Sequence, residues 1–186
     1  MRNLGSRTID TGRLLLRKKT VDDAQMMFEN WASDEKVAKC FNWPVHTEVE
    51  TTRRILAIME QTLANDDCYQ WGIVCKDNNE MIGTIGVSSI DYDKEAFELM
   101  FCVGSKFWGH GYASEALNGV LDFLFNQVDA KVAWASHGID NIVPGKVMRK
   151  CGLMYFRDSF KLDSHHSEYV FRDYKITKEE YLTRTK

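Results

Sequence analysis

The chain has 186 residues, of which 44% are apolar and 27% are charged, and its formal net charge is −3. This length suits one domain, and the composition is that of an ordinary globular protein. The small negative charge comes without a long run of one sign, so it gives no electrostatic basis for nucleic acid or an anionic membrane as the main partner. No stretch approaches the ~20 apolar residues that span a bilayer.

The cysteine pattern predicts neither a zinc site nor a disulfide framework, because no Cys-x-x-Cys pair occurs. Scattered, reduced thiols are typical of a cytoplasmic protein, which is the location that we expect. The adjacent His165 and His166 do not indicate a metal either, since neighbouring side chains in a strand point apart. The five cysteines are Cys40, Cys68, Cys75, Cys102 and Cys151.

The N-terminal quarter predicts one strand and two helices. Residues 14–16 are three leucines between arginines, which favours a short strand. Thr20 is a suitable N-cap for a helix whose apolar face contains Ala24, Met27, Phe28 and Trp31. A second helix is predicted over residues 48–63, where Ile55, Met59 and Leu63 recur every four residues.

The middle of the chain predicts three antiparallel strands. Residues 69–75 alternate as in a half-buried strand, the polar turn 76–80 follows, and a second strand is expected over about 81–90. After another turn at 91–94, residues 97–103 place Phe97 and Leu99 on one face and Glu98 on the other.

The last third alternates helices and strands. A Gly-rich loop at 104–111 leads into an apolar helix, followed by a strand at 132–136, a helix at 143–151, and strands near 154–160 and 168–175. Residues 177–186 are expected to form a short helix or a tail. The order predicts one α+β domain over residues 1–186, with a core of about 11–176 and a mixed, mostly antiparallel sheet flanked by helices.

The loop before the apolar helix is the strongest chemical signal. Gly109 and Gly111 allow a tight turn and a close backbone approach, and the first amides of the following helix suit a pyrophosphate. Ser114 could add a hydroxyl to the same phosphates. A Walker loop is absent, and a dinucleotide fingerprint would require a third glycine where Ser114 stands. A plain helix-entry loop stays an alternative.

The segment Trp108-Gly109-His110-Gly111-Tyr112-Ala113-Ser114-Glu115-Ala116 resembles motif A of the GNAT superfamily of acetyltransferases. Its form is similar to that of the branch of ribosomal-protein N-terminal acetyltransferases (RimJ/RimL-like). Residues 11–17, Thr-Gly-Arg-Leu-Leu-Leu-Arg, resemble the first strand of that branch. Residues 141–153, from Asn141 to Leu153, resemble its Asn-x-x-Ser-x-x-Val-x-x-Lys-x-Gly segment.

This resemblance implies a fold in which the strands at 97–103 and 132–136 splay apart and hold acetyl-CoA between them. The Phe101 amide would polarise the thioester carbonyl, and the amides of the Gly-rich loop would hold the pyrophosphate. The expected cofactor-binding residues are Phe101, Cys102, Val103, Trp108, Gly109, His110, Gly111, Tyr112, Ala113, Ser114, Asn141 and Lys146.

Three positions depart from the family pattern. Lys106 replaces an Arg or Gln, and Pro144 replaces a common Ser. Met148 aligns with the Tyr that other GNAT enzymes use as general acid, so the sequence does not identify the group that acts as general acid.

Acetyl transfer to an amine requires a group that takes the proton of the nucleophile. Glu98 is the first candidate for this base, because it matches an acidic position that the family often uses, and a surface glutamate is the alternative. His137, expected in a loop just past a strand, is the second candidate. Cys102 could suggest a covalent acyl-enzyme, although a structural cysteine and direct transfer are the favoured interpretation.

The acceptor is expected to be a primary amine, either a peptide or protein N-terminus or a small molecule. Its site would include the aromatic loop between the two N-terminal helices, with Phe41, Trp43 and His46 as substrate-binding residues and Asn42 beside them. Asp140, Asp158 and Asp163 could attract a cation, although a solvated position is the default. The alternative function is a non-catalytic module that binds acyl-CoA as a sensor. For the assembly, the sequence leaves a homodimer open.

Overall fold

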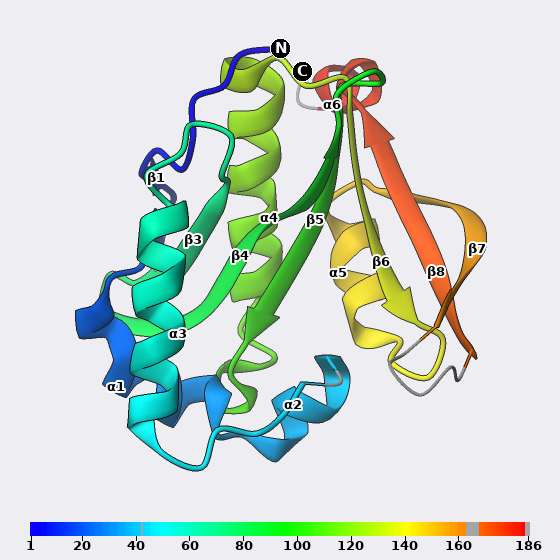
Figure 1. Ribbon diagram of the computed structural model, residues 1–186. Coiled ribbons are helices and arrows are strands. Elements are labelled where there is room, and N and C mark those ends of the chain that lie inside the picture. The colour runs from blue at the N-terminus through cyan, green and yellow to red at the C-terminus, as the bar shows by residue number, and fades with distance from the viewer. Residues whose placement is uncertain (42, 163–167, 185–186) are drawn as a thin grey trace.

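The computed structural model describes residues 1–41, 43–162 and 168–184, so Asn42, Asp163, His165 and His166 lie outside the described residues. One eight-stranded sheet runs through the molecule in the order β1-β2-β3-β4-β5-β6-β8-β7 (Figure 1). The strands are β1 Ile9–Asp10, β2 Leu14–Arg17, β3 Gln70–Cys75, β4 Glu80–Asp91, β5 Ala96–Val103, β6 Val132–Gly138, β7 Met154–Leu162 and β8 Glu168–Thr177.

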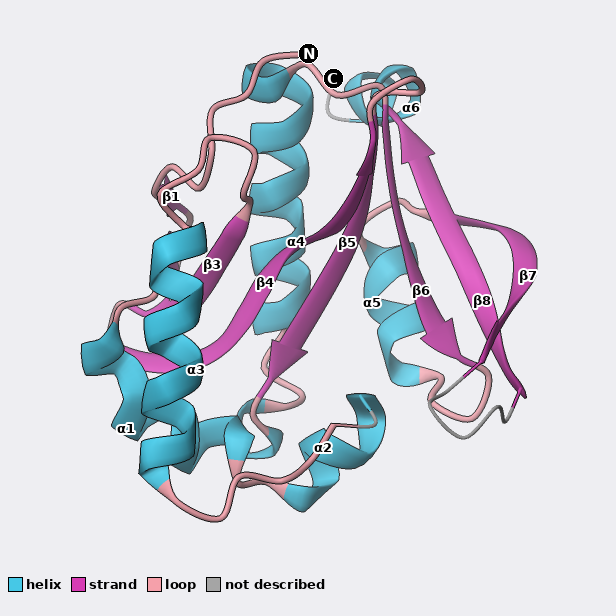
Figure 2. Ribbon diagram, in the orientation of Figure 1, coloured by secondary structure: helices cyan, strands magenta, loops and turns pink. Residues whose placement is uncertain are grey.

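Helices cover both faces of this sheet (Figure 2). The helical segment at residues 21–32, which includes α1, lies with α3 on one face, and α4 and α5 lie on the other, as Figures 1 and 2 show. The helices are α1 Ala24–Met27, α2 Glu35–Phe41, α3 Val49–Thr62, α4 Tyr112–Phe123, α5 Val143–Lys150 and α6 Lys178–Arg184. A 3₁₀ turn at Val21–Asp23 leads into α1, and π-helical turns at Phe28–Ala32 and Leu124–Val128 extend α1 and α4. No helix among these residues is long and apolar enough to cross a membrane.

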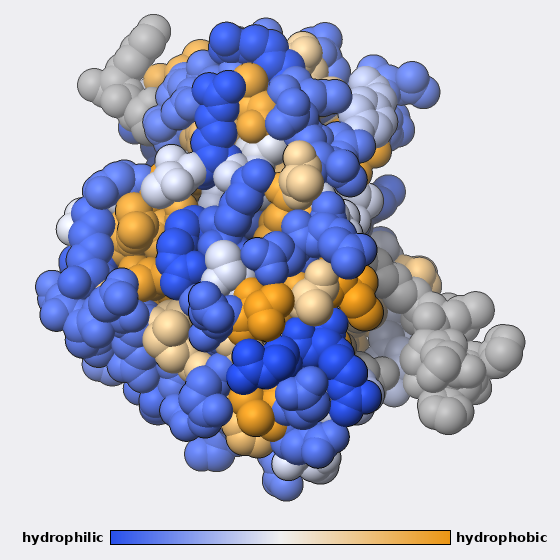
Figure 3. Space-filling view, turned by 60° about the vertical axis from the view of Figure 1, so that its left-hand side comes forward, coloured by the Kyte–Doolittle hydropathy of each residue, from blue (hydrophilic) through white to orange (hydrophobic). Residues whose placement is uncertain are grey.

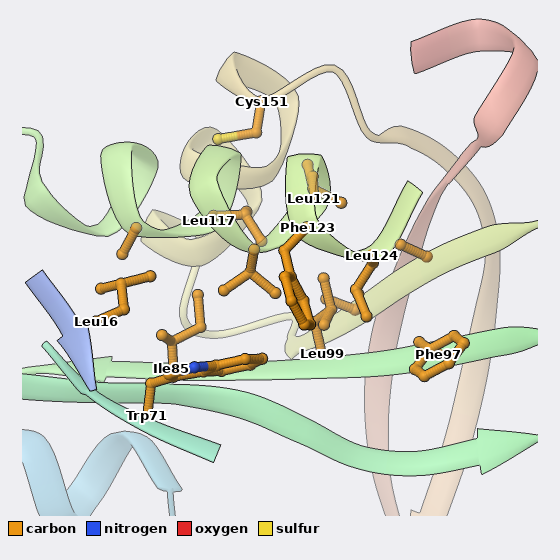
Figure 4. Close-up of a cluster of buried hydrophobic side chains, with 14 of the residues drawn as sticks. Leu16, Trp71, Ile85, Phe97, Leu99, Leu117, Leu121, Phe123, Leu124 and Cys151 are labelled. Carbon is orange, nitrogen blue, oxygen red and sulfur yellow. The ribbon is translucent and has the colours of Figure 1, made fainter. Parts of the chain in front are cut away.

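The main core lies between the sheet and α4 (Figure 4). Phe123 of α4 points towards Trp71 of the sheet, and Leu117, Leu121 and Ile85 belong to the same buried cluster. The rings of Trp71 and Phe123 meet edge to face, with centroids 5.7 Å apart. These side chains are fully buried, and burial of each stabilises the fold by about 1.5–3 kcal/mol.

A second, smaller core lies on the opposite face, beneath the N-terminal helices. It contains Trp31, Val37, Val74, Met81 and Cys102. Strand β3 is therefore buried on both faces, and the expectation of a half-buried strand is wrong. The reason is that helices cover both sides of the sheet, so the strand needs no polar face.

The predicted elements are otherwise confirmed, with local differences. The short strand β1 and the helix α2 are additions, and α2 places Phe41 at the end of a helix rather than in a loop. Strand β6 runs two residues further than expected, to Gly138. The C-terminal segment forms the helix α6.

Strands β5 and β6 form a parallel pair that is short. The paired positions run from Ala96 and Val132 to Leu99 and Ala135, and the two strands then diverge (Figure 1). Antiparallel pairing holds between the other neighbouring strands described. The last four residues of β5 therefore border an opening in the sheet.

Candidate active site

Strand β5 turns alternate backbone groups towards this opening. The Gly104 amide donates to the Ile82 carbonyl on the β4 side, whereas the Glu95 carbonyl accepts from the Lys131 amide on the β6 side. Because backbone groups alternate along a strand, those of Phe101 and Val103 face the diverging part of β6. The Val103 carbonyl accepts a bond of 2.7 Å from Nε1 of Trp108, and the amides of Phe101 and Val103 are donors that face the opening.

The backbone of Cys102 faces β4, whereas the backbone groups of Phe101 and Val103 face the opening. Cys102 pairs with Thr84 of β4, and its side chain is only 2% exposed within the smaller core. Burial raises the pKa of the thiol far above its ordinary range. This geometry does not bring Cys102 to the opening, and it leaves the thiol without the activation that a covalent mechanism requires.

The Gly-rich loop crosses the end of β5 and enters α4. Its first part forms a single 3₁₀ turn, Ser105–Phe107. Gly109 has φ +84° and Gly111 has φ +81°, a left-handed conformation that glycine adopts without steric cost. Gly111 is the N-cap of α4, so the first amides of the helix lack intrahelical partners next to the loop. Their dipoles suit an anion.

A network from the N-terminal strand region fixes this loop. The Glu115 carboxylate accepts bonds from the Thr11 hydroxyl (2.7 Å), the Arg13 amide (2.6 Å) and the Arg13 guanidinium (2.8 Å). Burial opposes ionisation of Glu115, but these bonds outweigh it and hold its pKa below the ordinary value. Arg13 also donates to the His110 carbonyl at 3.1 Å and lies over the Tyr112 ring at 4.7 Å.

This network explains two of the sequence motifs together. Thr11 and Arg13 belong to the first motif, and Glu115 belongs to the loop motif, 102 residues from Arg13. The guanidinium of Arg13 and the ammonium of Lys150 both lie close to Gly111. Sequence reasoning missed this role for Arg13, Glu115 and Lys150, because no local signal joins such distant positions.

The remaining loop residues are differently exposed. Trp108 is 48% exposed although its indole donates to Val103. The His110 ring stacks on Tyr112, and its Nδ1 lies 3.0 Å from the Trp108 carbonyl. Ala113 lies in the first turn of α4, whereas Ser114 is buried and its carbonyl accepts from the Cys151 thiol.

Helix α5 borders the other side of the opening. The backbone amide of Asn141 donates to the Gly138 carbonyl at 3.0 Å. Pro144 occupies the first turn of α5, and Lys146 is exposed. Met148 is 1% exposed in the main core. Met148, which the sequence resemblance aligns with a general acid, therefore points into the core in this chain.

Glu98 lies on the face of β5 that α3 covers, at the edge of a large cavity. The Ser89 hydroxyl donates to its Oε2 at 2.8 Å, and Ser89 lines the cavity. The cavity has a volume of about 870 Å³ between the N-terminal helices and β4. Its lining includes Lys19, Trp31, Trp43, His46, Ser89 and Met100.

The predicted substrate-binding residues divide between the wall of the cavity and its support. Trp43 and His46 line the cavity. The Phe41 ring stacks on the Trp43 ring, with centroids 4.6 Å apart, and does not itself line the cavity. Nδ1 of His46 lies 2.7 Å from the Thr52 hydroxyl, and burial lowers the pKa of His46.

His137 contradicts the expectation of a loop histidine. It belongs to β6 and is 5% exposed, with its ring stacked on Tyr174. Nδ1 bonds to the Gly138 carbonyl at 2.8 Å, and Nε2 has no hydrogen-bond partner among the described residues. Because Glu98 pairs with Trp134 and side chains alternate, Glu98 and His137 point to opposite faces of the sheet. They do not form a pair.

The described part of the chain contains no cluster of three or more His, Cys, Asp or Glu side chains that could hold a metal ion. Asp140 and Asp158 are exposed, and Asp158 lies 3.9 Å from Arg172.

Comparison with known proteins agrees with this geometry. Residues 13–154 match the acetyltransferase (GNAT) domain family. The chain is 32% identical over 130 residues to the uncharacterized N-acetyltransferase p20 of Bacillus licheniformis, which covers 67% of this chain and 72% of that protein. A GNAT-family acetyltransferase from Bacillus anthracis superposes with a TM-score of 0.79 at 24% identity, over 93% of this chain and 99% of the other.

A further solved structure is that of RimL, a ribosomal L7/L12 α-N-protein acetyltransferase, in complex with coenzyme A. Its TM-score is 0.76 at 18% identity, over 92% of this chain and 98% of that one, so the likeness shows the fold. The sheet and its covering helices thus have the fold of the solved acetyltransferase structures. The chain belongs to the acetyltransferase (GNAT) family, which speaks against a non-catalytic sensor.

Proposed function

We propose that the protein transfers an acetyl group from acetyl-CoA to a primary amine, by direct transfer within a ternary complex. One observation supports this most strongly. Strand β5 turns the Phe101 amide towards the opening, while Glu98, on the same strand, borders the large cavity. A thioester in the opening and an amine in the cavity would therefore meet at one strand.

In this mechanism acetyl-CoA supplies the activated acyl group, and the chain provides orientation and proton transfer. The amides at the start of α4, with Arg13 and Lys150 nearby, would hold the pyrophosphate. The Phe101 amide would donate to the thioester oxygen as negative charge develops there. Glu98 would take a proton from the ammonium form of the acceptor, directly or through water, which leaves the neutral amine that attacks the thioester.

The departing thiolate also needs a proton. Met148 offers none, and its side chain is buried in the core. We propose that this proton comes from the acceptor nitrogen, which after deprotonation by Glu98 still carries one proton more than the amide product. Among amines, the motifs of the RimJ/RimL-like branch favour the α-amine of a peptide or a protein N-terminus.

A thermal-shift experiment tests the cofactor assignment, with acetyl-CoA, CoA, NADH and ATP as ligands. A ligand at 100 times its Kd should add about 2.7 kcal/mol to the free energy of unfolding. The informative variant is Ala113→Glu, which adds a negative charge at the proposed phosphate site. Glutamate in the first turn suits the helix dipole, so this variant should fold.

We expect acetyl-CoA and CoA to raise the melting temperature of the wild type and to lose most of this effect in Ala113→Glu. The matched control is Ala57→Glu, the same change at an exposed position of α3, which should respond like the wild type. A shift with NADH alone, or an equal shift in both variants, would overturn the assignment of the loop.

A further inference from the structure

The large cavity contains a buried cation. Lys19 lies in the extended segment between β2 and the first helical turn, lines the cavity, and is 2% exposed. Its ammonium group donates to the Thr84 hydroxyl at 2.9 Å, and that hydroxyl donates onward to the Trp71 carbonyl. The one acceptor that the ammonium meets among the described residues is therefore a neutral oxygen.

Nearby acids do not neutralise Lys19. No carboxylate of the described residues lies within 4.0 Å of its ammonium nitrogen; Asp23, close enough to interact electrostatically, is bound by two bonds from Arg17, of 2.7 and 2.8 Å. Asp67 lines the cavity from an exposed position. A buried ammonium is costly unless an anion compensates its charge, and burial lowers the pKa of Lys19 to about 8.

We propose that Lys19 binds a carboxylate carried by the acceptor, so that the enzyme acetylates primary amines that also bear a negative charge. This inference rests on the proposed function. It adds a substrate class that the apolar walls alone do not specify, because Trp31, Trp43 and Met100 would accept any apolar amine.

The sheet register sets the length of such an acceptor. Thr84, which holds Lys19, pairs with Cys102, while Gly86 pairs with Met100 and Ser89 pairs with Glu98. At about 3.3 Å per residue, the carboxylate would lie roughly 7–15 Å along β4 from the reacting amine. Peptides of two to four residues with a free C-terminus span this distance, as do long ω-amino acids.

The test uses matched acceptors that differ only in charge. Trialanine and 6-aminohexanoate are each compared with the corresponding amide, and the acetylated product is measured by mass spectrometry. The variants are Lys19→Met, which removes the charge at similar length, and Lys18→Met, which removes an exposed charge one residue away that does not line the cavity.

We expect the wild type and Lys18→Met to prefer the acids at least tenfold in kcat/KM, and this ratio to fall to about one in Lys19→Met. Equal rates for acid and amide in the wild type, or a preference that persists in Lys19→Met, would overturn the proposal.

A binding measurement without acetyl-CoA separates this inference from the proposed function. Trialanine should raise the melting temperature of the wild type more than trialanine amide does, and Lys19→Met should respond equally to both. If no amine is acetylated but this difference appears, the carboxylate site stands and the acetyl-transfer proposal fails. If amines are acetylated without any difference, only the carboxylate site fails.

Discussion

Lys19 illustrates at the residue scale how a binding group can oppose stability. Its pKa of about 8 in the folded chain lies below the ordinary 10.5, so folding disfavours its charged form. Between pH 8 and pH 10.5, Lys19 is therefore more protonated in the unfolded chain than in the folded chain. The destabilisation is therefore complete below pH 8 and disappears as the pH rises towards 10.5.

We expect Lys19→Met to raise the free energy of unfolding at pH 7 by about 1–3 kcal/mol. The lost bond to Thr84 offsets part of the gain, although Thr84 keeps its bond to Trp71. Urea denaturation at pH 7 and pH 9.5 should show a smaller gain at the higher pH, and Lys18→Met should change little at either. A destabilised Lys19→Met at pH 7 would contradict this account.

Glu98 gives a second prediction at this scale. Glu98→Gln should lower kcat by about 10²–10⁴-fold, because the amide cannot accept the proton of the amine. The loss should shrink at high pH, where the free amine is already neutral. Binding of acetyl-CoA should persist, and Glu50→Gln on the exposed part of α3 serves as the control. Unchanged kcat in Glu98→Gln would place the proton transfer elsewhere.

The candidate site was predictable where its signals are local. The Gly-rich loop, Glu98, Trp43 and His46 were expected from the sequence and stay predictions in their roles. Lys19 gave no signal, since a lone lysine in a polar segment reads as a surface residue. His137 was misjudged, although it continues the alternation of Ala133 and Ala135, which could have placed it inside the strand.

At the element scale, α5 packs so closely on β6 that Gly145 has no room for a side chain. A Cβ at this position would lie 2.5 Å from Nε2 of His137 and 3.3 Å from the Tyr174 hydroxyl. His137 is buried and stacked, so its ring cannot move away freely. The pairing of helix and strand here depends on glycine for close approach.

We expect Gly145→Ala to destabilise the protein by about 1–3 kcal/mol, although the same change in a free helix stabilises by roughly 0.5–1 kcal/mol. In a His137→Ala background the cost should fall by more than 1 kcal/mol, because the contacting ring is gone. A double-mutant cycle in urea measures this coupling. Additive effects would show that the close contact is not responsible.

Most elements were predictable because their periodicity is strong, as in α4 and β5. The exceptions follow from tertiary contacts. Strand β3 is buried on both faces by helices that are distant in sequence. The two-residue strand β1 exists through pairing with β2, and Ile9 and Asp10 have no pattern of their own.

At the scale of the whole molecule, the surface is polar with separate apolar spots on the face that Figure 3 shows. The sheet beneath has two parts, β1–β5 and β6–β8–β7, joined by the parallel pairs from Ala96 to Leu99. The proposed cofactor site lies at this junction, where the strands separate.

A bound cofactor should therefore protect the free edge of β5. We expect amide hydrogen exchange at Phe101 to be fast in the free protein and to slow at least tenfold with CoA, because its amide would then donate to the ligand. The Met100 amide, which faces β4, should change much less. NMR measures the exchange rates of these two amides with and without CoA. If CoA slows both amides equally, or slows neither, the result would argue against a ligand in the opening.

The short parallel join between β5 and β6 also bears on the order in which the chain folds. Strands β3, β4 and β5 follow one another through short turns, so their pairing needs only local loops to close. Strand β6 reaches β5 only after α4 has crossed the sheet. Contacts of longer range form later, and a join with few hydrogen bonds opens most easily. The pairing of β5 with β6 is thus the part of the sheet that we expect to form last in folding and to open first in local unfolding.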